Sequence, residues 1–255
     1  MSIKDILAIG INGDGDGMEV RYLPAGDEAM VIEFGKTIDD EVNNKVISMA
    51  ASIKDKRIRG VREILPTYRS LMVFYNPQKI SYIRLVSIVK SIDYEQKSNA
   101  AEDNKTLIVP CCYDDLYGPD LSQMSEELNI PKEEIVSIHS GMKYKIFMLG
   151  FLPGFVYLGG LDKRINIPRL KTPRTKIPAR SVGIGGSQTG VYPVDSPGGW
   201  RLIGSTPLDF YDIKREKPIL CEAGEYIRFK PVSREEYDDI RREIELHHYR
   251  MEYEE

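Results

Sequence analysis

The segment 162–180 holds the residues best suited to chemistry, because it is far more basic than the rest of the chain. It carries seven basic side chains against one acidic side chain, whereas the whole chain of 255 residues has a net charge of −4. Pro168, Pro173 and Pro178 recur at five-residue intervals and hold the segment extended rather than helical. An extended basic segment can concentrate an anion, either a carboxylate or a phosphate. The alternative is a solvated loop whose charges face water.

Four side chains of this segment are candidates for contact with the anion. Arg174 is the first choice, because a guanidinium matches the geometry of a carboxylate or phosphate better than an ammonium does. It is also predicted to act in catalysis, by stabilising charge that develops during a reaction. Arg169, Lys171 and Lys176 complete the predicted anion-binding set.

Polar and aromatic residues follow in a stretch rich in glycine and proline, which predicts short strands and tight turns. Gln188, Thr189 and Ser196 are predicted to bind a small polar substrate through hydrogen bonds. Tyr192 and Trp200, the single tryptophan, can form a wall beside it. Alternatively, both aromatic side chains plug the core of a small barrel, which is the more common use of such residues.

His139 is the remaining candidate for catalysis, since the other two histidines are neighbours at His247 and His248. An unperturbed histidine has a pKa near neutrality, so His139 can act as a general acid or base. The alternative is a cap at the end of a helix. His247 and His248 are adjacent, so they point to different sides of a helix and make a poor metal pair. The stretch 12–17 resembles the start of a calcium loop, but Leu23 stands where such a loop needs a glutamate. We therefore predict no metal site.

Several other classes of function find no support in the sequence. The glycine-rich run 183–190 lacks the ending of a P-loop, and no Gly-x-Ser-x-Gly nucleophile motif occurs. The charge gives no reason to expect nucleic-acid binding, and no apolar run is long enough to span a membrane. Cys111, Cys112 and Cys221 lack metal-binding spacing and indicate reduced cysteines of a cytoplasmic protein.

Hydrophobic periodicity predicts an α+β fold with two domains. The first has the order strand, strand, helix, strand, strand, helix, which builds a small α/β layer domain. The polar stretch Gln96–Lys105 marks a boundary, and the second domain has enough short strands for a compact barrel, among them Leu208–Tyr211. Ser233 and Glu236 form a capping-box pattern that begins a terminal helix. The predicted parts are a flexible lead-in 1–18, an N-terminal domain 19–98, a barrel domain 106–231 and a charged helical tail 232–255.

Three ordered blocks carry a resemblance to a known family: Met148–Asp162, Thr172–Pro193 and Ser196–Pro207. Together they resemble the signature of the family that contains the B subunit of 5-oxoprolinase, a sporulation-kinase inhibitor and allophanate hydrolase subunit 1. Weaker similarity extends from about Arg21 to Pro231. The resemblance implies a small N-terminal α/β domain followed by a cyclophilin-like β-barrel.

The same resemblance implies a function within a complex. We expect a subunit of an ATP-dependent 5-oxoprolinase, which opens 5-oxo-L-proline to L-glutamate together with subunits C and A. ATP is the expected cofactor, at a site shared with a partner subunit. Two alternatives stay open: an inhibitor of a sporulation histidine kinase, and half of a biotin-dependent carboxyltransferase of the urea-degrading type.

Two positions depart from the pattern of the family, and one pair matches it. Val156 stands where proline is usual, and we expect this to change only the rigidity of a turn. Arg180 stands where glycine is usual, which adds a charge at a turn and puts the standard backbone or ligand preference in question. His139 and Ser140 match a His-Ser pair of the family, which supports a functional role for His139.

Overall fold

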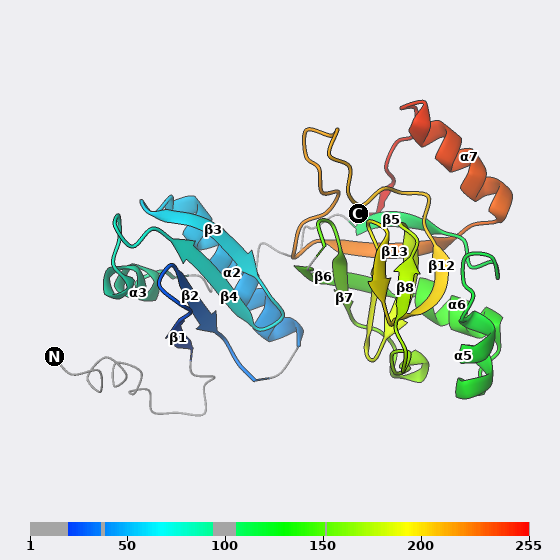
Figure 1. The fold of residues 1–255 in the computed structure, drawn as a ribbon, viewed down its shortest axis with the longest axis horizontal. Helices are drawn as coiled ribbons and strands as arrows, with labels where there is room; N and C mark the ends of the chain where they lie inside the picture. Colours follow the sequence, from blue (N-terminus) through cyan, green and yellow to red (C-terminus); the bar gives the residue numbers. More distant parts are fainter. Residues whose placement is uncertain (1–19, 37–38, 94–105, 151, 255) are drawn as a thin grey trace. The chain divides into compact units, whose positions relative to one another are not determined.

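The computed structural model describes residues 20–36, 39–93, 106–150 and 152–254 (Figure 1). The chain divides into two compact units, 1–102 and 103–255, and each has its own hydrophobic core. The predicted lead-in 1–18 and the predicted boundary 96–105 lie outside the described residues. Within the described ranges, every helix is too short or too polar to cross a bilayer.

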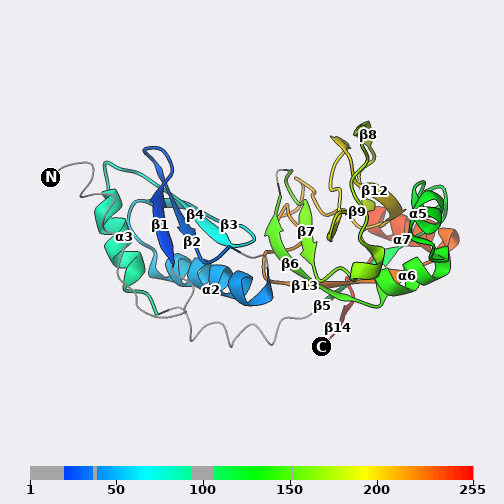
Figure 2. The ribbon, with the colours of Figure 1, turned by 90° about the horizontal axis from the view of Figure 1, so that it is seen from below.

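The N-terminal unit is a four-stranded antiparallel sheet with two helices packed against it (Figure 2). The side chain of Asp39 caps the first helix by accepting a hydrogen bond from the backbone of Val42, and Ser81 caps the second helix in the same way. The order of elements confirms the prediction from periodicity. The elements are β1 Arg21–Pro24, β2 Ala29–Glu33, α2 Asp40–Lys56, β3 Val61–Pro66, β4 Ser70–Tyr75 and α3 Tyr82–Lys90, in the sheet order β1-β2-β4-β3.

The C-terminal unit is built around an eight-stranded mixed sheet. Its last helix begins with the predicted capping box of Ser233 and Glu236. Its elements are β5 Thr106–Cys111, α5 Leu121–Leu128, α6 Lys132–Ser140, β6 Lys143–Leu149, β7 Val156–Gly159, the 3-10 helix η3 Lys163–Ile165, β8 Arg174–Ile177, β9 Ser181–Gly185, β10 Gln188–Val191, β11 Ser196–Gly198, β12 Arg201–Ser205, β13 Tyr226–Pro231, α7 Arg234–Glu245 and β14 Tyr253–Glu254.

The strands of this sheet follow the order β12-β9-β10-β7-β6-β13-β5-β14, and β8 pairs with β11 in a separate ribbon. Only β5 and β13 run parallel among the described neighbours. One isolated bridge joins Cys112, just after β5, to Ser205 of β12. The ladder between described residues is therefore not continuous around a barrel, and the architecture that the structure shows is a mixed α+β fold.

The predicted strand Leu208–Tyr211 is wrong. The chain turns there, because the hydroxyl of Thr206 accepts a hydrogen bond of 3.2 Å from the backbone of Leu208. Tyr211 makes only an isolated bridge to Ile219. A local side-chain acceptor has replaced a strand ladder as the partner of the backbone.

The two departures from the family pattern have different structural consequences. Val156 does not lie in a turn as expected but is a buried residue of β7, where it pairs with Leu149. Arg180 keeps the left-handed backbone that favours glycine, with φ of 71°. Its guanidinium pairs at 3.1 Å with Asp209, which also pairs at 2.8 Å with Arg241 of α7. The charge at this turn thus helps to fasten the terminal helix.

Candidate functional site

One face of the β9–β10 hairpin carries three glycines, Gly183, Gly185 and Gly190, which we call the glycine floor. Gln188, which pairs with Gly185, lies on the same face. Gly183 pairs directly with Gly190, and the alternation of side chains along a strand places Gly185 on the same face. Trp200 lies against this floor. A β-carbon at Gly185 would come within 2.4 Å of Cδ1 and Nε1 of Trp200, and one at Gly190 within 3.0 Å of Cζ3. Only glycine therefore fits beneath the indole.

Three further aromatic rings surround Trp200 and complete what we call the aromatic cluster. The ring centroids of Phe155, Tyr157 and Tyr192 lie 5.5, 5.8 and 6.2 Å from that of Trp200, all in edge-to-face geometry. Trp200 and Tyr192 are each 3% exposed, so these two predicted substrate-binding residues meet as a small core. Burial also raises the pKa of Tyr192. Tyr157, which sequence analysis did not select, is the half-buried member of the cluster.

Arg169 lies over the indole, with 5.8 Å between its guanidinium carbon and the ring centroid. Backbone hydrogen bonds of 2.7 Å hold the chain on both sides of it, from Gly186 to Ile167 and from Leu170 to Gly199. The side chain is exposed, and none of the carboxylates in the described ranges forms an ion pair with it. The structure thus presents a guanidinium at the edge of the aromatic cluster, where an anion can reach it.

Arg174 differs from Arg169, because its guanidinium already pairs with a buried carboxylate. Its Nη2 donates to Oδ1 of Asp120 at 2.6 Å, while Oδ2 of Asp120 accepts from the backbone of Leu202 at 2.6 Å. Asp120 is 4% exposed, so the guanidinium compensates a charge that water cannot solvate. The geometry favours Arg169 over Arg174 for contact with a ligand.

The other predicted binding residues lie around this centre without converging on one point. Lys176 pairs with Asp195 at 2.8 Å on the surface, and Lys171 is exposed. Gln188 is half-buried and begins β10 beside the glycine floor. Ser196 is buried in β11, and its hydroxyl has no hydrogen-bond partner in the part of the chain that the structure describes.

His139 and Thr189 meet on the opposite, inner face of the same hairpin. The distance between Nε2 of His139 and Oγ1 of Thr189 is 2.8 Å, and Nδ1 of His139 lies 2.8 Å from the hydroxyl of Tyr113. Burial lowers the pKa of His139 to about 3. The expectation of a pKa near neutrality is therefore wrong for this residue, and its general acid–base role stays a prediction.

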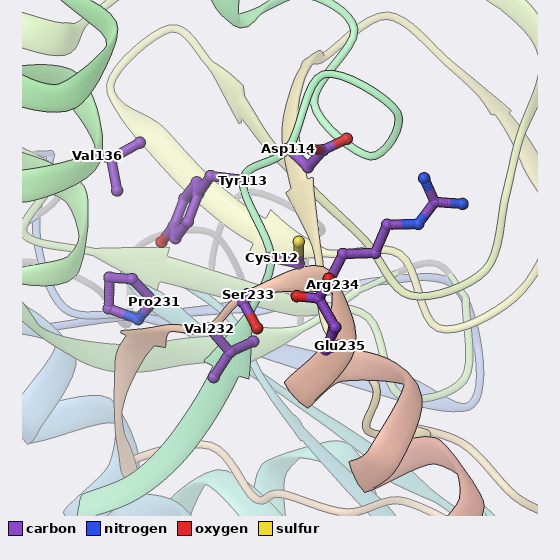
Figure 3. A pocket seen from close by; sticks show the side chains of 9 residues that line it. All are labelled: Cys112, Tyr113, Asp114, Val136, Pro231, Val232, Ser233, Arg234 and Glu235. Carbon is purple, nitrogen blue, oxygen red and sulfur yellow. The ribbon is translucent and has the colours of Figure 1, made fainter.

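Tyr113 also lines an open pocket of about 510 Å³, and none of the three floor glycines is among the residues that line it (Figure 3). It is bounded by the chain after β5, by α6 and by the junction of β13 with α7. The hydroxyl of Ser233 is committed to the capping box at this junction. The described residues contain no cluster of side chains suited to a metal ion, here or elsewhere. The pocket is lined by Cys112, Tyr113, Asp114, Val136, Pro231, Val232, Ser233, Arg234 and Glu235.

Sequence reasoning missed three residues that organise the site. Asp120 occupies the N-cap position of α5, but its carboxylate makes no capping hydrogen bond and instead binds Arg174. Tyr113 carries no local signal of its link to His139. Tyr157 lies inside the first signature block, and that position was the one available clue.

Comparison with known proteins identifies the relatives of this chain. The family described as "Carboxyltransferase domain, subdomain C and D" matches residues 20–221. The B subunit of 5-oxoprolinase from Bacillus subtilis (strain 168) is 40% identical over 240 residues, which cover 89% of this chain and 99% of that protein. The B subunit of 5-oxoprolinase from Escherichia coli O157:H7 is 36% identical over 208 residues, which cover 81% and 93%.

A solved structure extends the likeness to the fold. The crystal structure of TTHA0988 superposes on 80% of this chain with a TM-score of 0.73 at 30% identity, and the match spans 40% of that longer chain. The protein described here therefore belongs to the carboxyltransferase domain family, subdomain C and D, and within it to the B subunits of 5-oxoprolinase.

Proposed function

We propose that this chain is a subunit of an ATP-dependent 5-oxoprolinase, which opens the lactam of 5-oxo-L-proline to give L-glutamate. The observation that carries the proposal is the 40% identity to the B subunit of a 5-oxoprolinase across 99% of that protein. The match leaves almost none of the relative's length uncovered, so it extends over both units of the chain.

The aromatic cluster and its basic edge support a small, flat, anionic substrate. In this proposal the guanidinium of Arg169 binds the carboxylate of 5-oxoproline, and the half-buried ring of Tyr157 flanks the lactam. Gln188 pairs with Gly185 of the glycine floor, and we assign its amide to the lactam group. Opening the ring requires water to add at the lactam carbonyl, the C–N bond to break and the released amine to take a proton. This chain binds and orients the substrate for that step.

Partner subunits are proposed to supply the rest of the chemistry. The glycine-rich run does not fit a phosphate cradle, because it is paired as a hairpin and Trp200 lies against Gly183, Gly185 and Gly190. We therefore place ATP on a partner, or between this chain and a partner, and we name subunits C and A as the partners. The match to TTHA0988 leaves 60% of that chain unmatched, which agrees with additional protein beyond this part.

Finer features of the fold belong to the same proposal. We assign the eight-stranded sheet to a cyclophilin-like barrel, with the bridge between Cys112 and Ser205 as its point of closure. The domains follow as 19–98 and 106–231, with the helical tail at 232–255. The three free, buried cysteines agree with a reducing compartment, and we propose the cytoplasm.

The test is reconstitution of the complex from this chain and the candidate subunits C and A of the same organism. We expect a stoichiometric complex whose ATP hydrolysis is stimulated by 5-oxoproline, with one glutamate formed for each lactam consumed. Each component alone is the control and should show no stimulation. A stable complex that neither hydrolyses ATP in response to 5-oxoproline nor forms glutamate would contradict the proposal.

The two alternative functions appear as distinct outcomes of the same experiment. A stable complex that acts on another amide, or that transfers a carboxyl group from biotin, would support the urea-type function. Failure of this chain to bind subunits C and A, together with inhibition of a sporulation histidine kinase, would support the inhibitor function.

A further inference from the structure

A buried chain of hydrogen bonds ends on the glycine floor, and its direction follows from the number of hydrogens available. Thr189 donates its single hydroxyl hydrogen to the backbone oxygen of Gly183 at 3.0 Å. The hydroxyl must therefore accept from Nε2 of His139, at 2.8 Å. Nδ1 of His139 is then an acceptor, and the hydroxyl of Tyr113 donates to it at 2.8 Å. One neutral tautomer of the imidazole satisfies every member of this chain.

Packing leaves the imidazole no alternative position. His139 is 0% exposed, and its ring centroid lies 4.6 Å from that of Phe229 and 5.4 Å from that of Tyr144. The hydroxyl of Tyr144 also donates to the backbone oxygen of His139 at 2.9 Å. Loss of the hydrogen bond to Thr189 would leave the buried Nε2 of His139 without a partner, which would cost folding free energy.

The glycine floor has no side chains of its own to hold the two strands in place. Glycine has the largest conformational freedom of any residue and contributes no side chain to packing. Gly183 and Gly190 are paired, and Thr189 is the neighbour of Gly190 on the inner face. The hydrogen bond from Thr189 to Gly183 therefore crosses the same two strands that support Trp200.

We propose that His139 is a positioning residue, which holds the glycine floor through Thr189 and thereby sets the place of Trp200 and of Arg169 above it. The effect on ligand binding rests on the proposed function, whereas the effect on Trp200 does not. In this account His139 never touches the substrate. It acts from the inner face of the hairpin, and the ligand is bound beyond the outer face.

The single tryptophan makes the proposal directly measurable on the isolated chain. We would record the emission maximum of Trp200 and its quenching by acrylamide in Thr189→Val, which keeps the shape of the side chain but removes its hydroxyl. His139→Leu removes the donor in the same way. Thr189→Ser and His139→Gln retain a hydroxyl and an Nε donor, and serve as rescue variants. Leu107→Ala, in the buried core at the start of β5, controls for a general loss of stability.

We expect Thr189→Val and His139→Leu to shift the emission to longer wavelength and to increase quenching. Thr189→Ser, His139→Gln and Leu107→Ala should keep the parent's spectrum. In the reconstituted complex, Thr189→Val should raise the KM for 5-oxoproline about tenfold with kcat within about twofold, equivalent to about 1.4 kcal/mol of binding. Parent-like emission in both Thr189→Val and His139→Leu would overturn the positioning role. A shifted emission together with an inactive parent complex would leave that role standing and count against the proposed function alone.

Discussion

The two faces of the β9–β10 hairpin are built in opposite ways. On the outer face, Gly183, Gly185 and Gly190 leave a surface without side chains beneath Trp200, and the fit of the indole there depends on shape. The inner face carries Thr189, whose fit to His139 depends on the direction of hydrogen bonds. The outer face is therefore sensitive to any added side-chain atom, and the inner face is sensitive to the loss of a hydrogen-bond donor. A thin hairpin can thus support a binding site on one side while its stabilising polar groups stay hidden on the other.

The outer face should be the more sensitive of the two to an added atom. Gly185→Ala places a methyl group 2.4 Å from the indole of Trp200, and we expect it to lower the free energy of unfolding by about 3 kcal/mol. Urea unfolding followed by Trp200 emission measures this loss. Gly199→Ala is the matched control, because its nearest neighbour would be 3.6 Å away, an ordinary contact. Equal stability of the two variants would contradict a tightly fitted floor.

Arg174 and Arg169 have different assigned roles: Arg174 compensates the buried charge of Asp120, and Arg169 is proposed to bind the substrate. Arg174→Ala leaves the carboxylate of Asp120 buried without its partner, so we expect a loss of about 2 kcal/mol in the free energy of unfolding. Arg174→Lys keeps a positive charge near Asp120 and should recover part of this loss. If Arg174→Ala unfolds like the parent chain but abolishes substrate binding, the roles of the two arginines are the reverse of our assignment.

The inner face should be the one that responds to acid. Since burial lowers the folded-state pKa of His139 from 6.5 to about 3, the unfolded chain binds the proton first as the pH falls. Stability from this source is therefore complete above pH 6.5 and is lost as the pH falls toward 3. Between pH 7 and pH 5 the loss is about 2 kcal/mol.

His139→Gln removes the titrating group and should reduce the difference in unfolding free energy between pH 7 and pH 5 by that amount. Urea unfolding at the two pH values, followed by Trp200 emission, gives the difference for each protein. The same acid sensitivity in parent and variant would show that His139 is not the buried group responsible.

Local patterns in the sequence were sufficient for much of the fold. Helix α2 follows from its apolar periodicity and from the cap at Asp39, and α7 follows from the capping box at Ser233 and Glu236. Both depend on residues three or four positions apart, which interact in any helix. The strand predicted at Leu208–Tyr211 is wrong, and a local contact is again involved. The backbone of Leu208 donates to the hydroxyl of Thr206, two residues earlier, and not to a neighbouring strand.

The candidate site was only partly predictable, because its decisive contacts join distant parts of the chain. His139 and Thr189 were both selected from the sequence, yet no local signal indicates that they touch across 50 positions. Arg174 was selected for its chemistry, but its partner Asp120 lies 54 positions away, and no local pattern indicates their ion pair. Residue type indicates what chemistry is available, and tertiary contacts decide which side chain is free to perform it.

The most direct test of the account is the KM for 5-oxoproline of the reconstituted complex carrying Arg169→Ala. We expect the KM to rise about tenfold with kcat within about twofold, since the lost contact is to the carboxylate and not to the reacting bond. Lys163→Ala, which removes an exposed charge from the same basic segment, should keep the parent's KM. An unchanged KM in Arg169→Ala would contradict the placement of the substrate at the edge of the aromatic cluster.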